Sequence, residues 1–244
     1  MASRRILRLT GSDTEEFLQN LVTNDIGKLK KGLVYAALLT PQGKYIADFF
    51  LKQDGGDILL DVADPLADDL VRRLSMYKLR ADVKISEPGL HLHRGTGPVP
   101  EDALPDPRHP DLGWRAYREA SESDDGSDWD AIRVAHCIPE SGIELTPDTF
   151  VLEAGFEALN GVDFKKGCYV GQEVTARMKH KTELRKGLRV VDVEGPTEPG
   201  GEILSDGKTA GTVFTRSGDR AIAYVRLDRA QGEMRSGEAT LSLT

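Results

Sequence analysis

Residues 33–52 read LVYAALLTPQGKYIADFFLK, and this stretch decides the fold of the first part of the chain. Residues 33–39 and 45–52 are mostly apolar, of strand-like length and composition. Between them stands Thr40-Pro-Gln-Gly, which carries proline and glycine at turn positions. The stretch therefore predicts an antiparallel hairpin.

The sequence on either side of this hairpin predicts a compact α+β unit. Residues 4–9, 57–62 and 81–85 have the pattern of strands. Two helices are expected, one after a capping box at residues 12–15 (SDTE) and one at Asp64-Pro65. The order strand, helix, hairpin, strand, helix, strand is that of a split βαβ, ferredoxin-like module.

The rest of the chain predicts a second module followed by a small barrel. Residues 88–110 are expected to form a loop, 113–119 a strand, and 129–138 and 150–159 two helices. From residue 186 onward, short alternating strands are separated by glycine turns, with Asp206-Gly207 as a strong hairpin signal. We therefore expect an α+β fold with three domains: 1–88, 89–185 (a second α+β module) and 186–244 (a β-barrel).

Composition limits the possible classes of protein. No apolar run approaches the roughly 20 residues that span a bilayer, and residues 1–11 resemble a strand more than a targeting segment. We therefore expect a cytoplasmic protein without a membrane partner. The net charge of −8 disfavours a general nucleic-acid binder. Cys137 and Cys168 make no disulfide framework or metal site, and an iron–sulfur cluster needs about four thiolates.

The segment 165–177, KKGCYVGQEVTAR, is the strongest candidate for chemistry. Gly167 and Gly171 flank Cys168, which lets the backbone turn sharply and approach a ligand. The neighbouring lysines and Arg177 are expected to favour the nucleophilic thiolate, and the basic run 165–189 to attract an anion. A tight surface turn with an unreactive cysteine explains the residues equally well. Cys137 is expected to be a core thiol.

Residues 166–177, KGCYVGQEVTAR, resemble the signature of the YgfZ group of folate-binding proteins. These are iron–sulfur cluster assembly or repair proteins related to the T-protein aminomethyltransferase of glycine cleavage. Three further segments are similar to this family, in the expected order: FLQNLVTNDI (17–26), LLTPQGKYIADFFL (38–51) and YKLRADV (77–83).

The resemblance implies ferredoxin-like modules and a C-terminal barrel around a central channel that holds tetrahydrofolate. It places Cys168 beside that folate as the reactive residue. By the same resemblance, the cofactor contacts are expected among a set of six residues: Asn24, Asp48, Lys166, Gln172, Glu173 and Arg177. Cations suit the anionic glutamate tail, and Gln172 or Glu173 offers hydrogen-bonding groups for the pterin ring.

Three functions follow from these patterns. The first is a tetrahydrofolate-binding accessory protein for iron–sulfur cluster assembly or repair, with iron–sulfur enzymes or assembly proteins as transient partners. The second is a folate-dependent aminomethyl transferase, although Ala47-Asp48 stands where such enzymes carry an acidic pair. The third is a docking module for a protein or, less favoured, a tRNA, without catalysis. Whether the chain is an enzyme stays open at this point.

Overall fold

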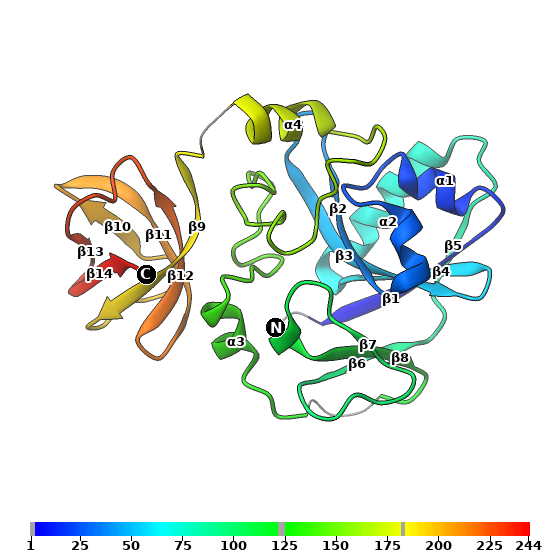
Figure 1. The fold of residues 1–244 in the computed structure, drawn as a ribbon, viewed down its shortest axis with the longest axis horizontal. Helices are drawn as coiled ribbons and strands as arrows, with labels where there is room; N and C mark the ends of the chain where they lie inside the picture. The colour runs from blue at the N-terminus through cyan, green and yellow to red at the C-terminus, as the bar shows by residue number, and fades with distance from the viewer. Residues whose placement is uncertain (1–2, 122–124, 182–183) are drawn as a thin grey trace. The chain divides into compact units, whose positions relative to one another are not determined.

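The computed structural model describes residues 3–121, 125–181 and 184–244 (Figure 1). The chain separates into two compact units. The first contains Met1–Ser127 and Glu157–Val174, and the second contains Asp128–Phe156 and Thr175–Thr244. The three-domain division expected from the sequence stays a prediction. Among the described residues, no helix has both the length and the apolar character needed to cross a membrane.

Within its described residues, the first unit contains two sheets, two complete α-helices and two 3-10 helices. Its elements are β1 (Arg4–Thr10), α1 (Thr14–Gln19), η1 (Ile26–Lys31), β2 (Val34–Leu39), β3 (Tyr45–Asp54), β4 (Asp57–Ala63), α2 (Asp64–Lys78), β5 (Lys84–Ser86), β6 (His91–Gly95), β7 (Leu104–Pro105), η2 (Pro110–Leu112) and β8 (Trp114–Arg118).

The larger sheet has the strand order β2-β3-β4-β1-β5, and every neighbouring pair is antiparallel. Strands β3-β4-β1-β5 with helices α1 and α2 form the ferredoxin-like arrangement. Strand β2 extends this sheet at the edge beside β3. The predicted hairpin and the predicted order of elements are therefore confirmed.

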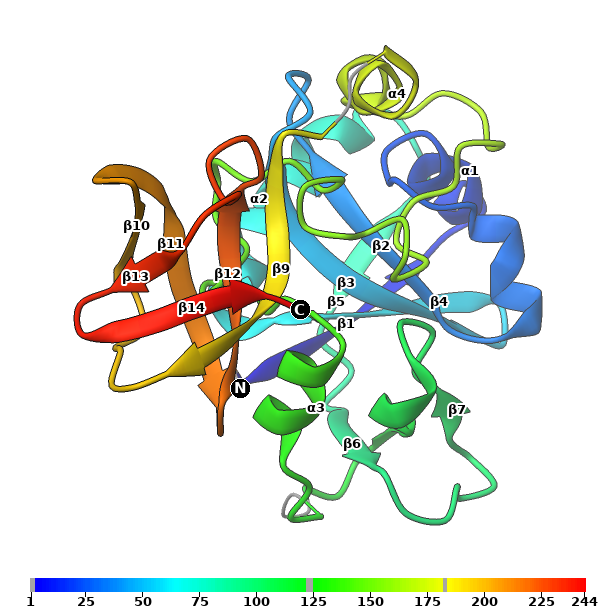
Figure 2. The same cartoon turned by 60° about the vertical axis from the view of Figure 1, so that its left-hand side comes forward.

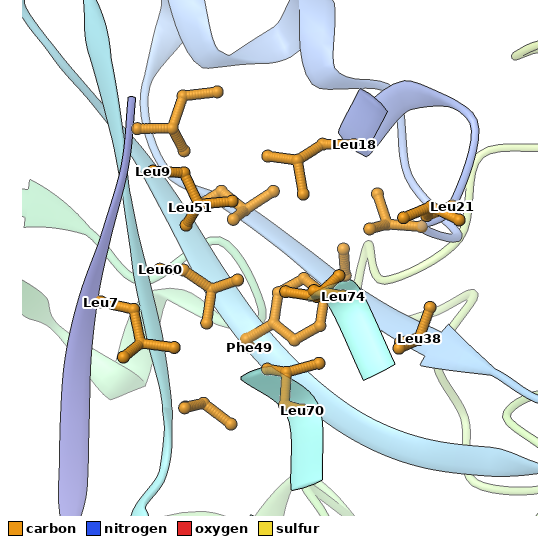
Figure 3. Close-up of a cluster of buried hydrophobic side chains, with 14 of the residues drawn as sticks. Leu7, Leu9, Leu18, Leu21, Leu38, Phe49, Leu51, Leu60, Leu70 and Leu74 are labelled. Atoms are coloured by element: carbon orange, nitrogen blue, oxygen red, sulfur yellow. The ribbon is translucent and has the colours of Figure 1, made fainter. Parts of the chain in front are cut away.

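The hydrophobic core of the first unit lies between the larger sheet and its two helices. Because successive strand residues point to opposite faces, β3 sends Ala47, Phe49 and Leu51 to this side. Leu70 and Leu74 of α2 lie beside Phe49 (Figure 3). Each fully buried side chain of this size contributes about 1.5–3 kcal/mol, which fixes the helices on the sheet.

The opposite face of the larger sheet is covered by the smaller sheet, which has the order β6-β8-β7. A buried charged network joins the two sheets. Arg115 of β8 pairs with Asp61 of β4 and Asp106, and its guanidinium carbon lies 3.8 Å from the ring centre of Phe50. Burial raises the pKa of Asp61, but Arg4 and Arg115 more than offset this, so the pKa lies below its usual value.

Replacing Arg115 with methionine is expected to lower the free energy of unfolding by about 3–5 kcal/mol, because Asp61 and Asp106 would be left buried with fewer cations. Urea denaturation followed by tryptophan fluorescence measures this, since Trp114 is in the same strand. The matched control is Arg118→Met in β8, whose pair with Asp102 is largely exposed and which should change the midpoint little. Equal effects of the two substitutions would contradict the assigned role of the network.

Two predictions for the first unit are wrong. Residues 88–110 are not a simple loop, because β6 and β7 form within them and pair with β8. The capping box is also absent. Helix α1 begins at Thr14 without a side-chain cap, and the Asp13 carboxylate instead accepts the backbone N–H of Asp82 at 2.8 Å.

The second unit contains one complete helix and a closed barrel of strands (Figure 2). Its elements are α3 (Trp129–Ala135), the greater part of α4 (Gln172–Lys181), β9 (Lys186–Glu194), β10 (Glu202–Ser205), β11 (Lys208–Ser217), β12 (Arg220–Arg226), β13 (Met234–Ser236) and β14 (Ala239–Leu243). The barrel order is β10-β11-β12-β9-β14-β13. Asp206 and Gly207 both have positive φ, as a two-residue hairpin requires, so the predicted barrel and turn are confirmed.

The helix predicted at residues 150–159 is wrong. Residues 151–160 form consecutive turns. Gly155 has a φ of +77°, which interrupts a right-handed helix, and the Glu153 carbonyl accepts the N–H of Leu188 in β9. The part of this segment up to Phe156 is therefore irregular and is bonded to β9 within the second unit, although its composition resembles that of a helix.

Candidate functional site

The thiol loop, defined here as residues 165–172, connects a turn to the start of α4. The whole loop belongs to the first unit, whereas α4 continues into the second unit after Val174. Lys166 and Tyr169 are buried, whereas Gly167 and Cys168 are exposed. The loop is therefore held by two buried side chains, Lys166 and Tyr169, and the side chain of Cys168 between them is exposed to solvent.

Lys166 anchors the first half of the thiol loop. Its ammonium donates to the backbone carbonyls of Gln19, Val22 and Asn24, at 2.7, 2.6 and 2.9 Å. Burial lowers the pKa of Lys166 to about 8, so the ammonium form carries the three hydrogen bonds at neutral pH. An ammonium has three protons, and all three are engaged. Lys166 therefore holds the loop on residues 19–24, and no proton is left to reach an anionic ligand.

Asn24 strengthens the same attachment. Its side-chain amide donates to the carbonyls of Tyr35 and Asn160, and its carbonyl oxygen accepts from Lys28 and from the N–H of Asp25. The donors are fully used inside the protein. Asn24 thus joins the end of α1, strand β2 and the approach to the thiol loop, which is a positioning role.

The second half of the thiol loop rests on the β2–β3 hairpin. Gly171 has a φ of +84°, and a side chain there would lie 2.7 Å from the carbonyl oxygen of Thr40. A side chain at Gly43 would likewise meet Val174 at 2.9 Å. Both close approaches require glycine. The hairpin and the thiol loop, two segments with family-like sequences, are thus packed against each other.

The polar residues after the cysteine lie at the start of α4. Gln172 begins the helix and its amide is 3.5 Å from the carbonyl of Gly167, while Glu173 is exposed in the first turn. Arg177 is also exposed, farther along α4 in the part that belongs to the second unit. The structure therefore brings Lys166, Asn24, Cys168 and Gln172 together within the first unit.

Asp48 lies in a buried polar cluster on the face of the larger sheet that points away from α1 and α2. Its carboxylate accepts hydrogen bonds from the hydroxyls of Tyr45 at 2.6 Å and Tyr35 at 3.0 Å. The side chain of Asp48 is almost fully buried and does not face solvent. Burial, followed by the charge of Asp48, raises the pKa of Tyr35 well above its usual value, so this phenol stays protonated and donates.

Ala47 and Asp48 point to opposite faces of β3. Ala47 is part of the helix-side core, whereas Asp48 faces the tyrosines. A carboxylate at position 47 would lie among apolar side chains, so the two positions cannot form one acidic pair. The absence of an acidic residue at position 47 is therefore explained by the apolar core on that face of β3. It gives no information about the chemistry at Asp48.

Three residues that lie around Asp48 were not identified from the sequence. Tyr35 and Tyr45 bind Asp48, and the Arg108 guanidinium lies 5.4 Å from the ring centre of Tyr35. Strand alternation was a signal for Tyr35 alone, because Tyr45 stands three residues before Asp48 and the β2–β3 pairing is irregular there. No signal existed for Arg108 in an expected loop. In the second unit, Cys137 is partly buried, and burial raises its thiol pKa to about 11, which disfavours the thiolate.

Known proteins resemble this chain in sequence and in fold. Residues 185–244 match the family model described as the CAF17 C-terminal beta-barrel domain. An iron-sulfur cluster assembly factor IBA57 homolog, mitochondrial, from Mycosarcoma maydis is 31% identical over 76% of this chain and 54% of that protein. The chain thus spans about half the length of this relative. The iron-sulfur cluster assembly factor IBA57, mitochondrial, of Mus musculus is 28% identical over 95% of this chain and 78% of the mouse protein.

The likeness to a solved structure concerns the fold. The glycine cleavage system aminomethyltransferase T from Bartonella henselae matches with a TM-score of 0.76 over 98% of this chain and 82% of that chain, at 14% sequence identity. The expected T-protein-like α+β fold with a small C-terminal barrel is therefore confirmed.

Proposed function

We propose that this protein is an accessory factor in iron–sulfur cluster assembly or repair, and that Cys168 is its reactive residue. The observation that carries the proposal is an exposed thiol held on a loop anchored at both ends. The relatives from Mycosarcoma maydis and Mus musculus are named iron–sulfur cluster assembly factors, which supports the same function. The expected place of action, the cytoplasm, remains part of this proposal.

The number of thiols defines what Cys168 can contribute. A cluster is usually held by about four thiolates, and the sequence has two cysteines, one of which has a raised pKa. Cys168 therefore supplies a single ligand to a cluster that is cargo, and a partner iron–sulfur enzyme or assembly protein supplies the others. Such a contact is transient, because one ligand cannot retain the cluster after the partner leaves.

The proposal is tested by deleting the gene and measuring the activities of cluster-dependent enzymes, with their total protein as a reference. Reduced activity at unchanged protein level, restored by the wild-type gene, is the expected result. Normal activities in the deletion, including under oxidative stress, would contradict an accessory role in cluster assembly or repair.

We further propose that tetrahydrofolate binds against Asp48. Its carboxylate accepts from the hydroxyls of Tyr35 and Tyr45, and a carboxylate is an acceptor of the kind that suits the N–H donors of a pterin ring. Lys166 and Asn24, whose donors are engaged, act in this proposal by positioning. Gln172, Glu173 and Arg177 remain proposed contacts. Bound folate would supply a one-carbon carrier, while the residues named here bind and orient it.

Replacing Asp48 with asparagine is expected to weaken tetrahydrofolate binding about 10- to 100-fold, because a charged acceptor becomes neutral. Anaerobic titration calorimetry measures the dissociation constant. The control is Asp57→Asn in the same unit, which pairs with Arg8 at the edge of β4 and should leave binding unchanged. If the wild-type protein does not bind tetrahydrofolate, the proposed cofactor is wrong. The proposed role of Cys168 is tested separately, by substitution of that cysteine.

A one-carbon transferase is the second candidate, favoured by the fold match to aminomethyltransferase T and by the buried carboxylate of Asp48. Incubating the protein with tetrahydrofolate and amine donors should then give methylene-tetrahydrofolate. The absence of product with every donor would count against this activity. A docking role without catalysis remains the third possibility. No contact in the described part of the chain favours tRNA as the partner.

A further inference from the structure

Arg108 lies in the connection between β7 and η2, beside the cluster that buries Asp48. Its guanidinium carbon is 4.7 Å from the ring centre of Phe50 and 5.4 Å from that of Tyr35. The hydroxyl of Tyr35 in turn donates to the Asp48 carboxylate at 3.0 Å. A guanidinium therefore stands at the ring, and a carboxylate at the hydroxyl, of the same tyrosine.

The orientation of Arg108 is fixed by Asp106. The Asp106 carboxylate accepts from Nε at 3.0 Å and from Nη2 at 2.8 Å, and a fork of this kind holds the plane of a guanidinium. Burial by itself would lower the pKa of Arg108, but Asp106 and Tyr35 more than offset this, so the pKa lies above its usual value and the group stays charged. The amide of Asn160 also donates to the carbonyl of Pro107, which holds the backbone next to Arg108.

The remaining nitrogen of this guanidinium, Nη1, has no hydrogen-bond partner among the described residues. The side chain of Arg108 is nine-tenths buried, with 10% of its surface exposed. In the described part of the chain, no nitrogen of Arg108 is both fully buried and without a partner, so Nη1 keeps access to solvent. A charged nitrogen with unused hydrogens is thus held rigidly at the edge of the buried cluster, where it is available to a ligand.

A carboxylate and a guanidinium at one site suit a ligand edge that carries donors next to an acceptor. The 2-amino-4-oxopyrimidine edge of a pterin has this order, because the 2-amino group and the N3–H donate and the 4-carbonyl oxygen accepts. Asp48 offers an acceptor for the first two groups, and Nη1 of Arg108 offers a donor for the third. A guanine base carries the same order of groups, so this chemistry is common to pterins and guanine nucleosides.

We propose that Arg108 reads the 4-carbonyl oxygen of the ligand whose N–H groups face Asp48. Nη1 donates to that oxygen, and Asp48 accepts from the neighbouring N–H groups. A ligand with an amino group in place of the oxygen would point hydrogens at a fixed cation and would bind less well. This inference rests on the proposed binding of tetrahydrofolate at Asp48, and it adds the residue that determines which heterocycle is accepted.

The contact is tested by anaerobic titration calorimetry of the wild type with tetrahydrofolate and with its 4-amino analogue, tetrahydroaminopterin. The two ligands differ only at position 4 of the pterin. The dissociation constant of the analogue should be at least about 10-fold higher, because one hydrogen bond to a charged donor is lost and replaced by a repulsion. Equal affinities, or tighter binding of the analogue, would overturn the role of Arg108 while leaving tetrahydrofolate as the ligand.

Arg108→Gln should shift the ratio of the two dissociation constants at least about 10-fold toward the analogue, since a side-chain amide can accept from an amino group. A variant that is merely loosened would bind both ligands more weakly at an unchanged ratio. Arg108→Lys keeps a cation for Asp106 and so protects the fold. One ammonium cannot replace the fork and also reach the carbonyl oxygen, so this variant should lose the preference as well.

The matched control is Arg118→Gln in β8, whose pair with Asp102 is largely exposed and which should leave both dissociation constants unchanged. A ratio that stays at the wild-type value in both Arg108 variants would overturn the assignment.

Guanosine and 2,6-diaminopurine riboside form the matching pair of ligands for the other source of this edge. If the wild type binds guanosine with the same preference and does not bind tetrahydrofolate, the proposed cofactor is wrong and the role of Arg108 is supported. If the wild type binds none of the four ligands, the proposed cofactor and the role of Arg108 both fail.

Discussion

Cys168→Ser should remove the ability of this protein to restore iron–sulfur enzyme activities in cells that lack it. Loss of residues that merely orient metal ligands costs 10- to 100-fold in metal affinity, so loss of a direct ligand should cost at least about 10-fold. Serine has nearly the same size, and the side chain at position 168 is exposed. The free energy of unfolding should therefore change by no more than about 0.5 kcal/mol.

The matched control is Cys137→Ser, which removes the other thiol of the chain. Burial raises the pKa of Cys137 to about 11, so this thiol is seldom ionised at neutral pH and should not take part. Activities of two cluster-dependent enzymes in complemented cells, together with the amount of each variant, give the comparison. A Cys168→Ser protein that restores the enzymes fully would exclude this cysteine from the function.

The sequence predicted the larger sheet of the first unit and the start of α2 well, because their signals are local. Two apolar runs and the turn that begins at Thr40 determine the hairpin, and the proline after Asp64 marks the start of α2. Predictions failed where tertiary pairing decides. Strands β6 and β7 are short and rich in residues typical of loops, and they exist because β8 pairs with both.

The sequence motif suggests where the site lies, but it could not predict the partners of the residues there. The motif singled out Cys168 as a candidate, and its side chain is exposed in the structure. The motif also suggested that Lys166 faces a ligand. Its observed partners are backbone carbonyls of residues 19–24, far away in the sequence. Carbonyl acceptors have no sequence signature, so a tertiary contact of this kind is invisible before the fold is known. The opposite orientations of Ala47 and Asp48, by contrast, follow from strand alternation alone.

Replacing Lys166 with methionine is expected to be the most damaging change at the site that leaves the thiol in place. Methionine fills much of the space of the lysine stem, but three carbonyl groups lose a charged donor, at about 1.5–3 kcal/mol each. Methionine recovers part of this loss because it has no charge to bury. The lowered pKa of Lys166 reports a desolvation cost of a few kcal/mol, which the variant avoids. The lost bonds outweigh that relief, so we expect a net destabilisation of about 2–4 kcal/mol.

The test of the proposed role of Lys166 is whether the substitution loosens the thiol loop, in addition to lowering the free energy of unfolding. Hydrogen exchange should show loss of protection at residues 165–172 before the core strands open, because the ammonium ties that loop to residues 19–24. Complementation should fall to the level of Cys168→Ser although the cysteine is present. Lys165→Met is the control, since Lys165 is exposed and adjacent to the same loop. If Lys166→Met kept full complementation with a loosened loop, a fixed position of Cys168 would not be needed. The function would then depend on an accessible thiol alone.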